Sequence, residues 1–149
     1  MQNLTIGLLQ FDQVWENKSQ NYKKIHQFMD SKIELDLLLL PEMFHTGFTM
    51  NTGLSESMEQ SSGVDFLKNI SATFDCAIYT SLIFSEKGKS YNRGVFIEPC
   101  GKTTIYNKRK TFGLAGEDKV YTSGESQVIV EYKNWKINLQ ICYDLRFPE

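Results

Sequence analysis

The feature that most constrains the fold of this chain is the way its first 41 residues alternate apolar strands with an amphipathic helix. Residues 4–10 (LTIGLLQ) and residues 35–40, which contain four consecutive leucines, predict two buried strands. Between them, over residues 17–33, apolar side chains recur at the spacing of one helix face, at Tyr22, Ile25, Met29 and Ile33. Pro41 ends the second strand. A strand, helix and strand in this order indicate an α/β protein.

The rest of the sequence predicts a second helix and more strands. Ser61-Ser62-Gly63 precedes the helix, whose inward face is expected to hold Phe66, Leu67, Ile70 and Phe74. Strands are predicted over residues 77–84, 91–97, 103–106, 127–132 and 135–141. The long polar segment 107–126 is typical of a functional loop. We therefore expect a mixed sheet covered by helices on one face.

Charge and composition exclude several classes of function. The 149 residues carry 16 basic and 18 acidic side chains, a net charge of −2, so no basic surface for nucleic acid or anionic lipid is expected. The longest aliphatic run, residues 37–40, is far too short to cross a membrane. Three widely spaced cysteines predict a reducing, cytoplasmic environment. No spacing suggests a metal site or a phosphate loop, so we expect no metal and no cofactor.

Three residues that could carry chemistry each follow a predicted buried strand: Glu42, Lys108 and Cys142. Ligands of α/β sheets bind at the carboxyl ends of strands. A carboxylate, an ammonium and a thiol at that edge could act as base, oxyanion stabiliser and nucleophile. Each also has a structural explanation, because Glu42 could cap a turn, Lys108 lies in a basic run, and Cys142 could be a small buried hydrophobe.

The segments around these residues resemble the motifs of the carbon–nitrogen hydrolase (nitrilase) superfamily. They are Pro41-Glu42-Met43-Phe44, Tyr106-Asn107-Lys108-Arg109 and Ile141-Cys142-Tyr143-Asp144-Leu145-Arg146-Phe147-Pro148-Glu149. They occur in the order in which the family has them. The resemblance implies a catalytic Glu-Lys-Cys triad at Glu42, Lys108 and Cys142. Lys110 is the alternative to Lys108, since both would lie on the same face if the strand continued.

The family also has a second glutamate in the loop between the lysine and the cysteine. The resemblance implies that this residue is Glu117, in the segment Gly113-Leu114-Ala115-Gly116-Glu117. Asp118 and Glu125 are the alternatives in the same loop.

Three further residues are expected to bind the substrate. The resemblance implies that the backbone N–H of Tyr143 helps to hold an oxyanion. Arg146 could bind a substrate carboxylate, although an ion pair with Asp144 or Glu149 is an equally simple explanation. His45 is close to Glu42 in the sequence and is expected either to line the pocket or to be an ordinary loop residue.

The resemblance implies a four-layer α-β-β-α sandwich. Because the chain stops just past the cysteine, we expect residues 1–149 to be the N-terminal portion of a longer hydrolase domain. The implied protein is a homodimer that needs no cofactor and hydrolyses a small amide.

Within the superfamily, the segments 113–117 and 142–149 are most similar to the omega-amidase branch, which deamidates 2-oxo acid amides such as 2-oxoglutaramate. The alternatives are a nitrilase, carbamoylase or aliphatic amidase with the same triad, or a catalytically silent binding module of the same fold. A papain-like protease requires a histidine partner, and neither His26 nor His45 is placed for that role.

Overall fold

The computed structural model describes residues 3–29 and 34–147. Ile33, which the sequence analysis assigned to the first helix, and Pro148 and Glu149 of the cysteine motif lie outside the described residues. The helices are α1 (Lys18–Phe28) and α2 (Ser62–Phe74), with four short 3₁₀ turns η1 (Thr52–Leu54), η2 (Gly113–Ala115), η3 (Glu117–Lys119) and η4 (Cys142–Arg146). The strands are β1 (Ile6–Leu8), β2 (Leu37–Leu39), β3 (Ala77–Glu86), β4 (Lys89–Ile97), β5 (Thr103–Asn107), β6 (Ile129–Tyr132) and β7 (Trp135–Asn138).

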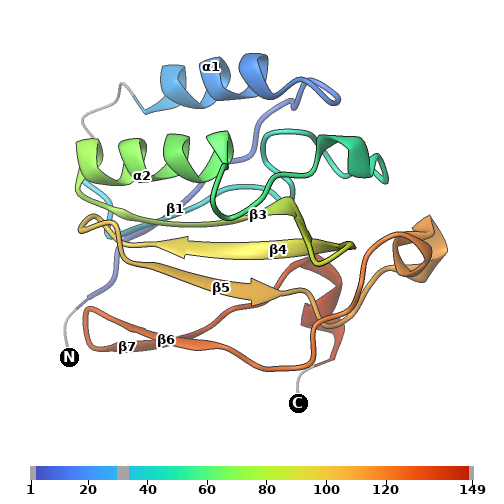
Figure 1. Cartoon of the computed structure of the whole chain (residues 1–149). Helices are drawn as coiled ribbons and strands as arrows, with labels where there is room; N and C mark the ends of the chain where they lie inside the picture. The colour runs from blue at the N-terminus through green and yellow to red at the C-terminus, as the bar shows by residue number, and fades with distance from the viewer. Residues whose placement is uncertain (1–2, 30–33, 148–149) are drawn as a thin grey trace.

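Within the described residues, the strands form one mixed sheet and one small antiparallel sheet. The larger sheet has the order β1-β2-β3-β4-β5, in which the first two pairings are parallel and the last two antiparallel. Strands β6 and β7 form the second sheet. Helices α1 and α2 lie on one side of the large sheet, and β6 and β7 lie on the other (Figure 1). The structure confirms the α/β fold and the mixed sheet with helices on one face.

Each face of the large sheet has its own apolar core. On the helix side, Ile25, Leu67 and Ile70 pack against the strand residues Ile78 and Leu82. On the opposite side, buried apolar residues of the two sheets pack together, among them Ala77, Phe96, Tyr106, Val130 and Tyr132. Strands β3 and β4 are therefore buried on both faces, which explains their almost continuous apolar sequence.

Side-chain caps start both helices near their predicted positions. Asn17 Oδ1 accepts a hydrogen bond from the Gln20 backbone N–H at 3.1 Å, and Ser61 Oγ accepts one from that of Val64 at 3.0 Å. Each cap satisfies a backbone donor that the helix itself leaves unpaired.

The prediction that the first strand is buried on both faces is wrong. Ile6 is 49% exposed and Leu8 is 78% exposed. The reason is that β1 lies at the edge of the large sheet and pairs only with β2 among the described residues. An apolar sequence predicts that a strand can be buried, but not which elements are present to cover it.

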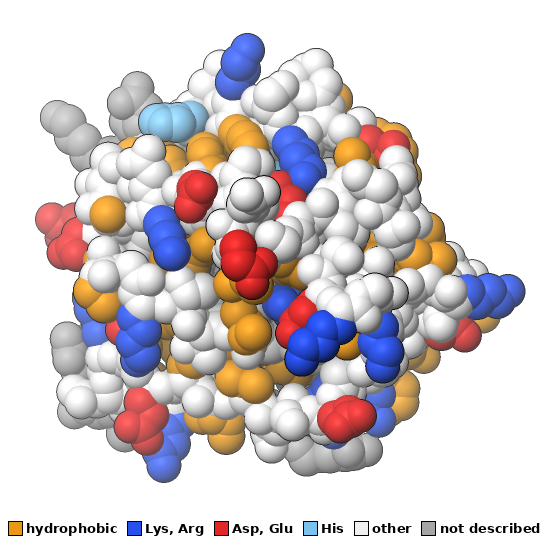
Figure 2. Space-filling view, in the orientation of Figure 1, with side chains coloured by type: hydrophobic (Ala, Val, Ile, Leu, Met, Phe, Trp, Pro, Cys, Tyr) orange, Lys and Arg blue, Asp and Glu red, His pale blue; other side chains and the backbone are white. Residues whose placement is uncertain are grey.

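On the face shown in Figure 2, basic and acidic side chains are interspersed. The described part of that face therefore presents no extended patch of one charge. Among the described helices, none has the length and apolar character needed to cross a membrane.

A buried polar network joins α1 and α2 to the segment that follows β2. The His45 side chain is fully buried, and its Nδ1 lies 3.1 Å from the Tyr22 hydroxyl and 3.9 Å from Glu56 Oε1. Lys18 Nζ donates to the same Glu56 oxygen at 2.7 Å. Burial lowers the pKa of His45 to about 4; Glu56 opposes this shift and Lys18 adds to it. His45 is therefore neutral at pH 7.

This network predicts a pH-dependent stability. In the unfolded chain His45 binds a proton near pH 6.5, but in the folded chain only near pH 4, so protons favour unfolding as the pH falls through this range. We expect the free energy of unfolding to fall by about 2 kcal/mol between pH 7 and pH 5 from this group. In His45→Gln that fall should disappear, as measured by urea unfolding at the two pH values.

The control is His26→Gln, which removes the exposed histidine of α1 and should keep the wild-type pH dependence. Burial raises the pKa of Glu56, but hydrogen bonds from Lys18 and Ser61 outweigh burial and lower this pKa below its ordinary value. The Glu56 carboxylate therefore stays ionised down to pH 5. An equal pH dependence in wild type and His45→Gln would contradict the prediction.

Candidate active site

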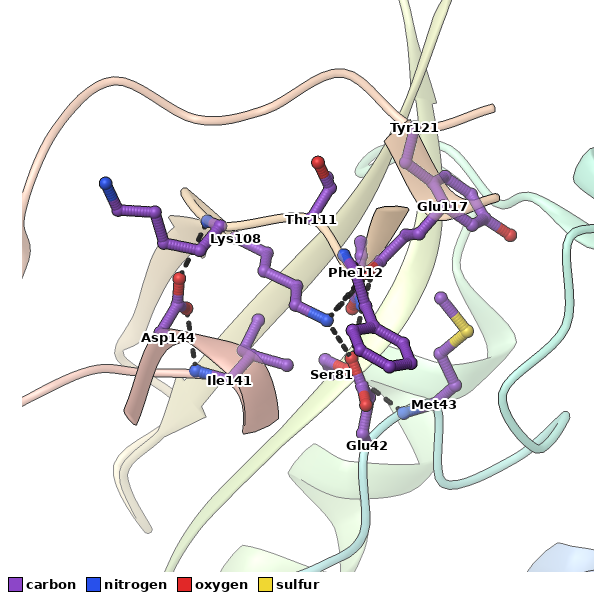
Figure 3. Close-up of polar contacts among 12 residues, drawn as sticks. Glu42, Met43, Ser81, Lys108, Thr111, Phe112, Glu117, Tyr121, Ile141 and Asp144 are labelled. Atoms are coloured by element: carbon purple, nitrogen blue, oxygen red, sulfur yellow. Dashed lines mark hydrogen bonds and ion pairs between the residues drawn. The ribbon is translucent and has the colours of Figure 1, made fainter. Parts of the chain in front are cut away.

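A buried ammonium between two carboxylates forms the centre of the candidate site. Glu42 lies just past the end of β2, Lys108 follows β5, and Glu117 begins η3 in the long loop. Lys108 Nζ donates to Glu42 Oε1 at 2.7 Å and to Glu117 Oε2 at 2.8 Å (Figure 3). The structure thus brings together three charged residues from separate parts of the chain.

These charges are removed from water to different degrees. The Lys108 side chain is 1% exposed, that of Glu117 is fully buried, and that of Glu42 is 15% exposed. Burial lowers the pKa of Lys108, but the neighbouring Glu42 and Glu117 carboxylates outweigh burial and raise it above its ordinary value. Lys108 is therefore held as an ammonium ion although it is buried.

The structure separates Lys108 from the alternative Lys110. The Lys110 Nζ lies 4.9 Å from the centre of the Phe147 ring, whereas Lys108 Nζ contacts both carboxylates. The loop carboxylates are separated in the same way. Asp118 and Glu125 are exposed, whereas Glu117 is buried and its Oε2 also accepts the Phe112 backbone N–H at 2.6 Å.

Cys142 lies at the start of η4, beside a cavity of about 450 Å³ that Glu42 also lines. Its φ angle is +45°, a conformation that costs energy for any residue with a Cβ and that is often found at functional sites. Burial raises the pKa of the Cys142 thiol, the charge of Glu42 raises it further, and Lys108 opposes both. The resting sulfur is therefore a thiol, and a base must remove its proton before it can attack as a thiolate.

Asp144 ties the turn that carries Cys142 to the segment that carries Lys108. Its Oδ2 accepts hydrogen bonds from the Tyr106 hydroxyl at 2.7 Å and from the Ile141 backbone N–H at 2.9 Å. Its Oδ1 accepts the Lys110 backbone N–H at 2.8 Å. In the sequence analysis Asp144 was only a candidate partner for Arg146. The structure instead shows it buried in the link between the two segments.

The sequence analysis missed Asn92 as a component of the site. Asn92 lies in β4, is 1% exposed, and donates through Nδ2 to Glu42 Oε1 at 2.7 Å and to Glu117 Oε1 at 2.9 Å. A polar residue inside an apolar strand was the available signal, but it does not indicate which residues it contacts. Ser81 of β3 was missed as well, and its Oγ accepts the backbone N–H of Met43 at 2.9 Å, next to Glu42.

The three expected substrate-binding residues lie in different places. The Tyr143 ring packs beside those of Phe112 and Phe147, at centre-to-centre distances of 5.0 and 5.2 Å. Arg146 is exposed, and no described carboxylate forms an ion pair with it. His45 does not line the cavity of Cys142, because its ring is buried against Tyr22 and Glu56 on the helix side of the sheet. The described residues include no group of three acidic, histidine or cysteine side chains that could hold a metal.

Comparison with known proteins identifies the family of this chain. The family model described as carbon-nitrogen hydrolase matches residues 5–149. Omega-amidase YafV of Yersinia enterocolitica is 34% identical over 148 residues, covering 99% of this chain and 57% of that protein. The 2-oxoglutaramate amidase of Bacillus subtilis is 29% identical over 150 residues, covering 97% of this chain and 58% of that protein.

A solved structure agrees with these matches. The crystal structure of XC1258 from Xanthomonas campestris, a CN-hydrolase superfamily protein with an arsenic adduct in its active site, superposes with a TM-score of 0.92 at 32% identity. The match covers 99% of this chain and 56% of that structure, so the chain spans a little over half the length of these relatives. With a family match over residues 5–149 and a relative that is 34% identical over nearly the whole chain, the chain belongs to the carbon–nitrogen hydrolase family.

Proposed function

We propose that the protein hydrolyses a non-peptide carbon–nitrogen bond of a small amide through a thioester on Cys142. The observation that carries this proposal is the Lys108 ammonium, buried between two carboxylates, one of which shares a cavity with a cysteine thiol. A base, a fixed cation and a nucleophile are the groups that acyl transfer to a thiol requires.

In the proposed first step, Glu42 takes the proton of the Cys142 thiol, and the sulfur attacks the amide carbon. The Lys108 ammonium and the backbone N–H of Tyr143 stabilise the oxyanion that forms. Glu42 then gives its proton to the departing ammonia as the carbon–nitrogen bond breaks, and the acyl group remains on sulfur as a thioester. The raised pKa of the Cys142 thiol supports a role for a base, because little thiolate forms without one.

In the second step, water releases the acid. Glu42 deprotonates the water as it attacks the thioester carbon and then returns this proton to the departing sulfur, which restores the thiol. Glu117, whose two oxygens already accept bonds from Lys108, Asn92 and Phe112, holds the Lys108 ammonium in place. Lys108 stays charged through both steps because Glu117, which takes no proton in this scheme, keeps its contact with the ammonium. Stabilisation of an oxyanion by one such donor contributes roughly 3–4 kcal/mol to the transition state.

For the substrate, we propose a small omega-amide that carries a free carboxylate, of the 2-oxoglutaramate type. Support comes from the relatives, among them Omega-amidase YafV and a 2-oxoglutaramate amidase. There is also an electrostatic requirement. Glu42 and Glu117 repel an acidic substrate unless a cation binds its distal carboxylate, and the exposed Arg146 lies four residues after the nucleophile. A nitrilase, carbamoylase or aliphatic amidase would use the same triad on another substrate.

We also propose that residues 1–149 are the N-terminal portion of a longer hydrolase domain, since 57% of the length of YafV corresponds to this chain. The cytoplasmic location and the homodimer stay predictions. The assays below use the protein at its native length.

Replacement of Cys142 tests the proposed nucleophile. Cys142→Ala should abolish ammonia release and Cys142→Ser should leave at most a trace, because only the thiolate can form the thioester. Cys100→Ala, which removes another exposed thiol, should keep wild-type activity. Activity within tenfold of wild type in either Cys142 variant would disprove the assignment. A silent binding module would show no ammonia release and no preference of a thiol reagent for Cys142.

The two lysines of the loop provide a second test. Lys108→Ala should lower kcat by about 10²–10³-fold, the usual loss when one oxyanion donor is removed. Lys110→Ala should have a much smaller effect, because its side chain packs on Phe147. Steady-state ammonia release gives kcat and KM, and thermal unfolding shows whether each variant is folded. Equal losses of kcat in the two folded variants would mean that Lys108 has no special role.

Substrate preference tests the omega-amidase proposal. At equal concentrations, 2-oxoglutaramate should release ammonia roughly tenfold to a hundredfold faster than butyramide or a short nitrile, because a contact with a charged group contributes on this scale. Arg146→Ala should weaken the preference and leave butyramide hydrolysis unchanged. Faster turnover of butyramide or the nitrile would contradict the omega-amidase proposal but not the proposed triad.

A further inference from the structure

Asn92 contacts every charged residue of the cluster, although the mechanism above assigns it no part. Its Nδ2 donates to Glu42 Oε1 at 2.7 Å and to Glu117 Oε1 at 2.9 Å. Its backbone carbonyl accepts the Lys108 backbone N–H at 3.0 Å. One neutral side chain in β4 therefore links two carboxylates, and its main chain aligns the lysine that lies between them.

The two contacts of Nδ2 orient the Asn92 amide so that its oxygen is left without a partner. Its Oδ1 is buried and has no hydrogen-bond partner among the described residues. A buried acceptor without a partner destabilises a fold, so packing alone does not favour an asparagine here. In the reverse orientation Oδ1 would face two carboxylates and be repelled. The contact with the carboxylates therefore determines how the side chain lies.

The charge of the cluster explains what such a donor contributes. Two carboxylates and one ammonium give a net charge of 1 − 2 = −1 in a largely buried site. Each carboxylate makes ionisation of the other less favourable, and Lys108 has to compensate both. A neutral amide that donates to both favours their ionised forms without adding a charge.

The hydrogen bonds also distinguish the two oxygens of Glu42. Lys108 Nζ and Asn92 Nδ2 both donate to Oε1. With Oε1 engaged twice, Oε2 is the oxygen that can take a proton from Cys142, which lines the same cavity as Glu42. Without Asn92, Glu42 could rotate and present the oxygen that Lys108 holds.

We propose that Asn92 is a positioning residue of this site, which fixes the Glu42 carboxylate with Oε2 toward Cys142 and keeps it apart from Glu117. The proposal rests on the proposed function for its kinetic test. Labelling of the Cys142 thiol provides a second test that requires no turnover.

The kinetic test compares wild type and Asn92→Ala across pH. The acid limb of kcat/KM should move to higher pH by about one unit, since a carboxylate that loses a hydrogen bond is protonated more readily. On the falling part of the acid limb this shift corresponds to a loss of about tenfold in kcat/KM at a given pH. The loss should appear in kcat, with KM changed by less than about threefold. Asn92 does not line the cavity of Cys142, so it is not expected to contact the substrate. An acid limb that coincides with that of wild type would overturn the proposal.

The titratable groups that face Glu42 come from four elements or loops. They are Tyr79 in β3, Lys108 after β5, Glu117 in η3 and Cys142 in η4. Burial raises the pKa of Tyr79 well above its ordinary value, so Tyr79 stays neutral, and Lys108 stays charged. The acid limb therefore reports on the carboxylates that Asn92 contacts.

Asn92→Asp separates positioning from space filling. Aspartate has nearly the same shape as asparagine, so it should be milder than alanine if Asn92 only fills space. If Asn92 holds the two carboxylates, a third carboxylate between them repels both, and Asn92→Asp should be the less active variant at pH 7. Where Asn92→Ala does not fold, Asn92→Asp is compared with wild type instead, and activity equal to that of wild type would overturn the proposal. A more active Asn92→Asp would overturn the proposal.

Asn21→Ala is the matched control. Asn21 is also fully buried and donates through Nδ2 to two acceptors, the backbone carbonyls of Val14 at 2.8 Å and His45 at 2.9 Å. Its loss should lower Tm but leave the acid limb in place, because the acceptors are uncharged. A shift in Asn21→Ala equal to that in Asn92→Ala would overturn the proposal.

Iodoacetamide labelling of Cys142, followed by peptide mass, gives the turnover-independent readout. The part of its rate that depends on Glu42 as base, seen below the pH at which the thiol ionises by itself, should show the same upward shift of about one unit in Asn92→Ala. Identical labelling profiles in wild type and variant would overturn the role of Asn92. Absence of ammonia release by wild type would instead disprove the proposed function, and the labelling profiles would still decide the role of Asn92.

Discussion

The buried ammonium of Lys108 is the constraint on which the site depends. A charge that is 1% exposed destabilises a fold by several kcal/mol unless carboxylates and hydrogen bonds compensate it. Its two carboxylates come from the end of β2 and from the loop after β5, so the compensation exists only when the sheet and that loop are both in place. Folding of the domain and assembly of the charged cluster are therefore coupled.

The backbone around the cluster is strained at two residues, and hydrogen bonds stabilise these strained conformations. Met43, next to Glu42, has φ of +48°, and Cys142 has φ of +45°. Such conformations cost on the order of 1–3 kcal/mol each. Ser81 Oγ accepts the Met43 N–H, while Asp144 accepts that of Ile141 next to the cysteine. Ser81 lies in β3 and Asp144 in the same turn as Cys142, so the base and the thiol are held by groups outside the triad.

The sequence predicted elements best where periodicity and end signals agreed. Helix α2, with its Ser61 cap and inward Leu67 and Ile70, occurs as expected, as do the hairpin strands β3 and β4. Glu42 and Lys108 lie just past strands as predicted, but the last strand ends at Asn138 rather than at residue 141, so Cys142 begins a 3₁₀ turn instead of following a strand directly. The predictions failed where the answer depended on neighbours in space. Strand β1 is apolar but lies at an edge, and His45 lies near Glu42 in sequence but faces the helices.

By itself, the sequence determined the α/β class, the order of most elements and the three motifs around Glu42, Lys108 and Cys142, because these depend on local hydrophobic period and on short segments. Only the tertiary structure decided that Lys108 rather than Lys110 contacts the carboxylates, and that Asn92 and Asp144 support the site. Those facts depend on the direction of single side chains across paired strands. Neighbouring positions on a strand point to opposite faces, and the register that pairs Arg93 with Asn107 brings Asn92 beside Lys108.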